Sequence, residues 1–268
     1  MNRYREKKIY CGDKYLEIDI YQVNILKTNT KSRSKKKRES LPAQKNLNDK
    51  NARRKFIQLV ETNFTEEDYH LTLTYNDKNL PSTLELAEKE VSNMLKRIAR
   101  KRKSKNLPKL KYILVTAHNE KKNGKIVRIH HHLIINGDGL TRDEIEELWS
   151  RPKRKGENKR ERIGYANADK LQADSNSGFI ALSTYLIKNP TSKKRWSCSQ
   201  NLKRPISRTN DYRYSRRQIN NIASKQFDPK WWESKYPGYF ITDKDSGYET
   251  IYNDITGWSI YLRLRKRE

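Results

Sequence analysis

The stretch Ile129-His130-His131-His132-Leu133-Ile134-Ile135-Asn136 places three consecutive histidines at the start of an apolar run. A short run of this kind is typical of a β-strand, in which successive side chains point to opposite faces. His130 and His132 are therefore predicted to project from one face, about 7 Å apart. Two imidazoles at that separation can bind one divalent metal ion, and a polar edge strand is the alternative interpretation. His131 is expected to pack or to form hydrogen bonds on the opposite face.

A second strand is predicted just before this one, at residues 112–118 (YILVTAH). The loop that follows contains Asn123-Gly124, a dipeptide typical of tight hairpin turns, so the two strands should pair. The hairpin offers two candidates for a third metal ligand, His118 and Glu120. We prefer His118, which strand parity places with Thr116, and expect Glu120 to lie in the turn as a solvated charge. Three imidazoles would suit Mn²⁺, Zn²⁺, Co²⁺ or Ni²⁺ better than Mg²⁺.

A helix is predicted over Ser177 to Lys188 (SGFIALSTYLIK), with an apolar stripe that ends at Leu186. Tyr185 and Lys188 are three residues apart and thus share one helical face. A phenol beside an ammonium group suits a nucleophile with a nearby cation, because a phenol has an ordinary pKa of about 10 and needs activation. The alternative is a half-buried aromatic residue next to a solvated charge at a helix end.

In this order, these segments resemble the single-tyrosine HUH endonucleases, and specifically the rolling-circle replication initiators of small plasmids, mobile elements and filamentous phages. The resemblance covers about residues 50–205, and His131 stands where relatives usually have a bulky apolar residue. The matching segments are His70–Tyr75 (HLTLTY) for the first motif, Ile129–Asn136 for the metal motif, Tyr185–Lys188 for the nucleophile helix, and Trp196–Pro205 for a segment that follows it.

The resemblance implies an α+β fold in which a mostly antiparallel central β-sheet is flanked by helices. It also implies metal-dependent, sequence-specific nicking and rejoining of single-stranded DNA through a covalent 5′-phosphotyrosine link, with Mn²⁺ or Mg²⁺ as the metal. Tyr185 and Lys188 would be the catalytic residues, and His130, His132 and His118 or Glu120 the metal ligands. The expected DNA-binding residues are Lys188, Arg195, Trp196, Lys203 and Arg204.

Composition agrees with a nucleic-acid partner. The chain has 59 lysines and arginines against 32 aspartates and glutamates, a net charge of +27. A surplus this large predicts a polyanionic partner and binding that weakens steeply with salt. Single-stranded or supercoiled origin DNA is the expected partner. No GxxxxGK[ST] motif occurs, so unwinding would depend on a host helicase or on supercoiling.

Membrane and secreted classes are not expected. The charged fraction is 34% and the mean hydropathy is −1.11, with no apolar run of about 18 residues. Cys11 and Cys198 show no CxxC spacing and suit a reducing compartment, so a cytoplasmic protein is expected.

Three domains are expected: an N-terminal segment of strands and a basic mobile loop (1–45), an endonuclease core (46–205), and a C-terminal helix and hairpin packed on the core (206–268). The other predicted elements are strands within 9–21 turned at Gly12-Asp13, a mobile loop over 28–42, a helix over 46–61, a strand over 69–75, a helix from Ser82 to about 103 with a Ser82–Glu85 capping box, a second capping box at Thr141–Glu144 before a helix ending at Trp149, a lysine-rich loop over 151–162, a strand over 163–171, a helix over 214–224, and a terminal hairpin whose strands end at Tyr252 and Leu264.

Other functions remain open. Conjugative relaxases and single-tyrosine transposases share the nicking chemistry and differ in the use of the product. A metal-dependent hydrolase with a water nucleophile would need no tyrosine. A non-catalytic nucleic-acid-binding module would explain the charge, but it would leave the histidine cluster without a purpose.

Overall fold

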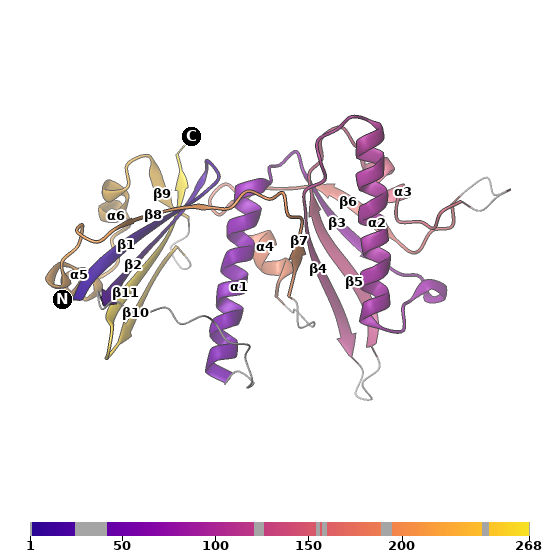
Figure 1. The fold of residues 1–268 in the computed structure, drawn as a ribbon. Helices are drawn as coiled ribbons and strands as arrows, with labels where there is room; N and C mark the ends of the chain where they lie inside the picture. The colour runs from indigo at the N-terminus through magenta and orange to yellow at the C-terminus, as the bar shows by residue number, and fades with distance from the viewer. Residues whose placement is uncertain are drawn as a thin grey trace. The chain divides into compact units, whose positions relative to one another are not determined.

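The computed structural model describes residues 2–24, 42–120, 126–153, 156, 160–188, 195–242 and 247–267. The chain divides into two compact units. We call Asn63–Ala173 and Phe179–Leu202 the central unit, and Met1–Thr62, Asp174–Gly178 and Lys203–Glu268 the terminal unit, since the latter combines segments from both ends of the sequence. Helices and antiparallel sheets occur together in the chain (Figure 1), which confirms the α+β prediction.

The central unit contains a five-stranded antiparallel sheet in the order β6-β3-β5-β4-β7. The histidine strand is therefore in the middle of the sheet, and the hairpin predicted from Asn123-Gly124 is formed by its two strands. The bounds are β3 Tyr69–Thr74, β4 Tyr112–Glu120, β5 Ile126–Ile135, β6 Ala166–Lys170 and β7 Ser197–Cys198.

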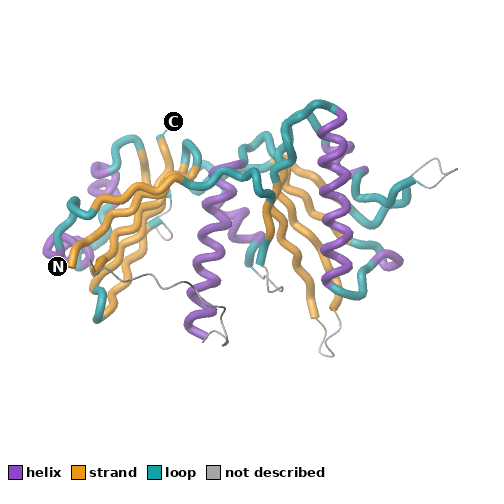
Figure 2. The backbone as a smooth tube through the Cα atoms, in the orientation of Figure 1, coloured by secondary structure: helices purple, strands orange, loops and turns teal. Residues whose placement is uncertain are grey.

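One face of this sheet packs against helix α2 (Leu84–Ser104) through a single apolar core, visible in Figures 1 and 2. Val91, Met94 and Ile98 of α2 lie in the same cluster as Leu71 of β3 and Leu133 of β5. Burying aliphatic side chains of this size contributes about 1.5–3 kcal/mol each, so this face holds the sheet in place. The opposite face is left for polar side chains.

Helix starts in the central unit follow capping chemistry. Helix α3 (Arg142–Glu147) has the predicted capping box, in which Thr141 and Glu144 bond reciprocally. The capping box predicted at Ser82 is wrong, because Thr83 is the N-cap of α2 and its side chain accepts from Leu86 N. Ser and Thr are both favoured at N-caps, so two adjacent candidates are hard to separate by residue type.

The remaining helical elements of the central unit are short. They are the 3-10 turn η1 (Asp77–Asn79) and helix α4 (Ile180–Leu186). Both α4 and β6 are shorter than the predicted segments 177–188 and 163–171.

The terminal unit contains a sheet in the order β10-β11-β2-β1-β8, with β9 also paired to β11. Its strands are β1 Asn2–Cys11, β2 Tyr15–Asn24, β8 Ile206–Asn210, β9 Tyr239–Ile241, β10 Tyr248–Asn253 and β11 Gly257–Lys266. Its helices are α1 Pro42–Asn63, α5 Arg216–Ala223 and α6 Pro229–Lys235. The predicted first and last hairpins are thus confirmed, and β2 pairs directly with β11.

Alternation along β2 gives the terminal sheet two different faces. Ile18 and Ile20 lie in an apolar cluster with Trp232 of α6. The intervening Glu17 and Asp19 accept hydrogen bonds from Arg54 of α1, at 2.6 Å each. Since buried carboxylates are stable when paired with a cation, Arg54 explains how charged residues occupy this strand.

Some predictions fall outside the described residues. The loop predicted over 28–42 lies there except for Pro42, which begins α1, and so does part of the loop predicted over 151–162. The domain boundaries at residues 45 and 205 stay a prediction, while the compact units assign most of α1 to the terminal unit. No helix in the described ranges is long and apolar enough to cross a membrane.

Candidate active site on the central sheet

His130 and His132 project from the same face of β5. In the neighbouring strands, Thr72 of β3 and Val115 of β4 lie opposite His132. The ring centroids of His130 and His132 are 5.2 Å apart, and the ring planes are almost perpendicular at 88°. The two imidazoles are therefore neighbours on one face, as a shared metal ion requires.

His131 lies on the opposite face of β5, fully buried in the core beside α2. Its Nε2 is 2.8 Å from the Tyr75 hydroxyl, and its Nδ1 is 2.9 Å from Oγ1 of Thr116. Burial lowers the pKa of His131 to about 3, with smaller contributions from His130 and His132, so this ring is neutral at pH 7. The prediction that His131 packs or forms hydrogen bonds on the other face is confirmed.

The tautomer of His130 is fixed by its own strand. His130 Nδ1 is 2.8 Å from the backbone carbonyl oxygen of Arg128. A carbonyl oxygen only accepts, so Nδ1 carries the proton and the lone pair of neutral His130 is on Nε2. Arg128 has a φ of +51°, and the β4–β5 register shifts between Ala117 and Asn119, which is a β-bulge. This irregular backbone positions the carbonyl under the ring.

His70 of β3 joins the cluster, although sequence reasoning did not select it as a site residue. Its Nε2 is 3.3 Å from Nδ1 of His132, and the two rings stack with centroids 5.4 Å apart. Thr72 Oγ1 is also 3.4 Å from that Nδ1. If His132 donates from Nδ1 to either partner, its Nε2 lone pair faces a ligand, which is how outer partners orient metal-binding histidines.

Electrostatics keep this face neutral. Burial lowers the pKa of His132 to about 4, and His70 and His130 lower it further because a second positive charge nearby is unfavourable. Burial also lowers the pKa of His70. Neutral imidazoles are the form that binds metals, so the cluster offers lone pairs at pH 7 without loss of a proton.

The third ligand stays a prediction. Thr116 lies on the core face with His131, so strict alternation would turn His118 away from His130 and His132. The bulge interrupts that alternation at the buried His118, and the side chain of Glu120 is outside the described residues. Within the described ranges, no group of three or more His, Cys, Asp or Glu side chains is positioned to hold a metal ion. The donor set that fits a metal is therefore the imidazole pair of His130 and His132.

Tyr185 of α4 lies against this pair. Its ring centroid is 6.0 Å from that of His132, with an interplanar angle of 69°. The side chain is nonetheless 65% exposed. Leu186, Ile180 and Ser183 are the buried residues of α4, so the apolar side of this helix anchors it and leaves Tyr185 open to solvent beside the histidines.

Lys188 is exposed and lies beyond the end of α4, which corrects the prediction that it shares a helical face with Tyr185. Its backbone N–H donates to the Tyr185 carbonyl at 3.2 Å, so a tight turn keeps the two residues close. Pro190 explains the early end of the helix, because proline disfavours helical conformation in the residue before it and cannot continue the hydrogen-bond ladder.

The other predicted DNA-binding residues are divided between the units. Arg195 and Trp196 are in the central unit, where Trp196 lines a cavity of about 240 Å³ with Thr116 and residues of α2. Lys203 and Arg204 are in the terminal unit. Arg204 lines a cavity of about 270 Å³ there, together with Lys7 and Lys55.

Comparison with known families finds one match. Residues 68–174 match a family model described as replication-associated protein ORF2. The matched segment runs from before β3 to after β6 and therefore includes the histidine hairpin and His70, while Tyr185 follows it. No curated protein and no solved structure matches the chain. The family match supports a replication-associated role.

Proposed function

We propose that this protein is a rolling-circle replication initiator that nicks and rejoins single-stranded DNA at an origin, with Tyr185 as the nucleophile. The observation that carries the proposal is the contact between the exposed Tyr185 ring and the His132 ring. It joins the one tyrosine whose sequence context resembles a nucleophile helix to the face of β5 that carries two imidazole ligands. The match of residues 68–174 to a replication-associated family supports the same role.

The reaction is a transesterification. The Tyr185 oxygen attacks the phosphorus of a phosphodiester in line, a phosphorus–tyrosine bond forms, and the bond from phosphorus to the 3′ oxygen breaks. The phenol proton leaves to a base or solvent, and the released 3′ oxygen takes up a proton to become a 3′ hydroxyl. The bond energy is kept in the 5′-phosphotyrosine link, so the reverse attack by a 3′ hydroxyl rejoins strands without a nucleotide cofactor.

His130 and His132 are the residues that would hold a divalent metal, and the ion would polarise the non-bridging oxygens of the phosphate. Mn²⁺ suits imidazole donors better than Mg²⁺, which prefers oxygen. His118 and Glu120 stay the candidates for a third ligand. Lys188, one short turn from Tyr185, would stabilise phenolate or the charge that develops on the phosphate.

DNA would be held by the basic residues around the site. Arg195, Trp196, Lys203 and Arg204 are the residues we assign to this role, with cations for phosphates and the indole for stacking on a base. The chain has no Walker-type phosphate-binding motif, so a host helicase or negative supercoiling would supply strand separation.

The test is covalent adduct formation. Full-length protein is incubated with Mn²⁺ and end-labelled single-stranded oligonucleotides that tile the DNA flanking the gene, and the products are resolved on a denaturing gel. We expect a protein–DNA adduct that requires both metal and Tyr185, and that Tyr185→Phe abolishes.

Tyr165→Phe is the matched control, because Tyr165 is an exposed tyrosine of the same unit, 62% exposed. It should still form the adduct. Cleavage retained in Tyr185→Phe would indicate a water nucleophile, and tight binding without any adduct would indicate a non-catalytic binding protein; either result overturns the proposal. A relaxase or transposase would form the same adduct but would act on transfer or transposon-end DNA instead of a replication origin.

A further inference from the structure

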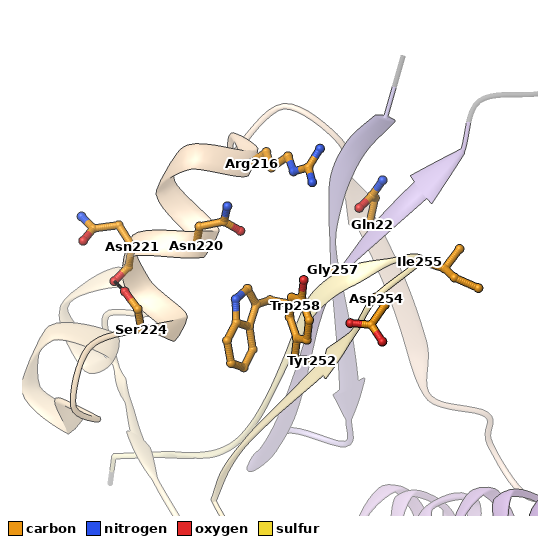
Figure 3. Close-up of a pocket in the computed structure, with 10 residues that line it drawn as sticks. All are labelled: Gln22, Arg216, Asn220, Asn221, Ser224, Tyr252, Asp254, Ile255, Gly257 and Trp258. Atoms are coloured by element: carbon orange, nitrogen blue, oxygen red, sulfur yellow. Dashed lines mark hydrogen bonds between the residues drawn. The ribbon is translucent and has the colours of Figure 1, made fainter.

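A cavity of about 500 Å³ lies in the terminal unit, away from any residue assigned to nicking. Figure 3 shows that helix α5 forms one side of it and that the β10–β11 hairpin forms the other, with Gln22 at the end of β2. Pockets of roughly 300–1,000 Å³ are the size that encloses small molecules and nucleotide-sized groups. The cavity is therefore large enough to receive a single base.

Two aromatic rings line the hairpin side. Tyr252 of β10 and Trp258 of β11 are paired across the strands, and their ring centroids are 5.0 Å apart. Tyr252 is 57% exposed, so its ring is not consumed by core packing. Exposed aromatic rings in a basic protein are the side chains on which unpaired bases stack.

Polar side chains line the opposite side. Arg216 and Asn220 reach from α5 toward the hairpin, as Figure 3 shows. Helix α5 is held by buried Ile219 and by a capping box at Ser215, so these two side chains have a fixed base. An amide both donates and accepts, as base edges require, and a guanidinium binds phosphate.

A buried hydroxyl lies beneath the turn of the hairpin. Tyr4 is 2% exposed, and its hydroxyl has no hydrogen-bond partner of normal geometry within the described part of the chain. A Cβ added at Gly257 would come within 2.9 Å of that hydroxyl and 3.4 Å of Gln22 Oε1. Gly257 also has a φ of +70°, so any other residue would be strained as well as crowded there. Glycine thus keeps this wall of the cavity low over two polar groups.

We propose that this cavity binds an unpaired base of single-stranded DNA, with the base stacked on Tyr252 and Trp258 and the neighbouring phosphate on Arg216. The net charge of +27 favours a polyanion over a neutral ligand. The carboxylate of Asp254, which also lines the cavity, repels phosphate and accepts from a base amino group, so it favours the base on its own side and the phosphate on the side of Arg216. The inference extends the proposed function by giving the terminal unit its own contact with the origin strand.

The first measurement is fluorescence anisotropy of a labelled thymidine oligonucleotide titrated with full-length protein. All variants are made in the Tyr185→Phe background, so that no covalent capture contributes. Tyr252→Ala and Arg216→Ala should each raise the Kd about tenfold, the loss typical of one base stack. Tyr252→Phe keeps the ring and should retain the original Kd.

Arg217→Ala is the matched control, because Arg217 is the next residue of α5, is exposed, and does not line the cavity. It should raise the Kd about threefold or less, as expected for one exposed charge. Equal effects of Arg216→Ala and Arg217→Ala, together with no effect of Tyr252→Ala, would overturn the inference. Tighter binding of a uridine oligoribonucleotide that depends on the same residues would overturn the assignment to DNA.

A second measurement locates the base directly. Photo-crosslinking with an oligonucleotide that contains 5-iododeoxyuridine, followed by peptide mapping, should yield adducts on peptides that contain Tyr252 or Trp258. Crosslinks confined to the central unit would overturn the inference. Because both measurements use protein that cannot form the Tyr185 adduct, they can fail while nicking by the wild type succeeds, and the reverse is equally possible.

Discussion

The two faces of the five-stranded sheet use the same side chain for different purposes. His131 and His132 are adjacent in β5, yet His131 is enclosed in the α2 core and His132 lies beneath the exposed Tyr185. Both nitrogens of His131 have hydrogen-bond partners in the protein, so its ring has no lone pair to offer a ligand. Strand parity, and not residue type, therefore separates a structural histidine from a candidate metal ligand.

The two faces also differ in what surrounds them. On the core face, aliphatic side chains exclude water and His131 is tolerated because Tyr75 and Thr116 satisfy it. On the other face, His70, His130 and His132 form a polar layer whose members contact each other. A polar layer that is not packed away by a helix is available to substrate. The predictions below test this contrast.

The largest effect is expected on catalysis. His132→Ala removes one of the two proposed metal ligands, and adduct formation should fall roughly a thousandfold, since Lewis-acid stabilisation is worth several kcal/mol and about 1.36 kcal/mol is tenfold. The rate is measured as single-turnover adduct formation in Mn²⁺. His131→Leu is the matched control and should keep most of the activity. Similar losses in both variants would mean that the two faces do not differ in function.

The next effect is expected on stability, with the order reversed. His131→Ala leaves a cavity and unpairs Thr116, and should lower the free energy of unfolding by about 3 kcal/mol. His130→Ala, on the partly exposed face, should change it by about 0.5 kcal/mol or less. Urea denaturation followed by circular dichroism measures both. A larger loss in His130→Ala than in His131→Ala would contradict the assignment of the core face.

The smallest effect concerns His70. Its contact with Nδ1 of His132 orients a ligand without being one, so His70→Ala should weaken Mn²⁺ binding about tenfold, the lower end for outer-shell partners. Isothermal titration calorimetry of the full chain measures this affinity. His132→Ala should weaken binding further than His70→Ala does. An unchanged Mn²⁺ affinity in His70→Ala would show that Thr72 alone orients the ring.

Local sequence patterns predicted much of the central unit. The alternation of the 129–136 stretch indicated the strand and the orientation of His131, and Asn123-Gly124 indicated the hairpin. The apolar stripe of 177–188 indicated the helix that carries Tyr185. Each of these signals is contained in a window of a few residues, which is the range over which periodicity and turn chemistry act.

Contacts between distant segments were not predictable in the same way. His70 reaches His132 only because β3 pairs with β5, and nothing in either segment specifies that register. Strand β8 is exposed along its whole length and shows no alternation, and β7 is only two residues long, so neither produced a signal. The bulge at Arg128 is likewise invisible in sequence, and it is the reason that parity alone does not decide the position of His118.

The pairing of β2 with β11 has a consequence for the order in which the protein is made. Synthesis proceeds from the N-terminus, so β2 is complete more than two hundred residues before β11 leaves the ribosome. All segments of the central unit emerge in that interval, and the histidine sheet can form while the first hairpin still exposes Leu16, Ile18 and Ile20 along an unpaired edge. Nascent chains of this protein therefore carry a long apolar strand edge, the feature most prone to aggregation, until translation of the final strand closes it.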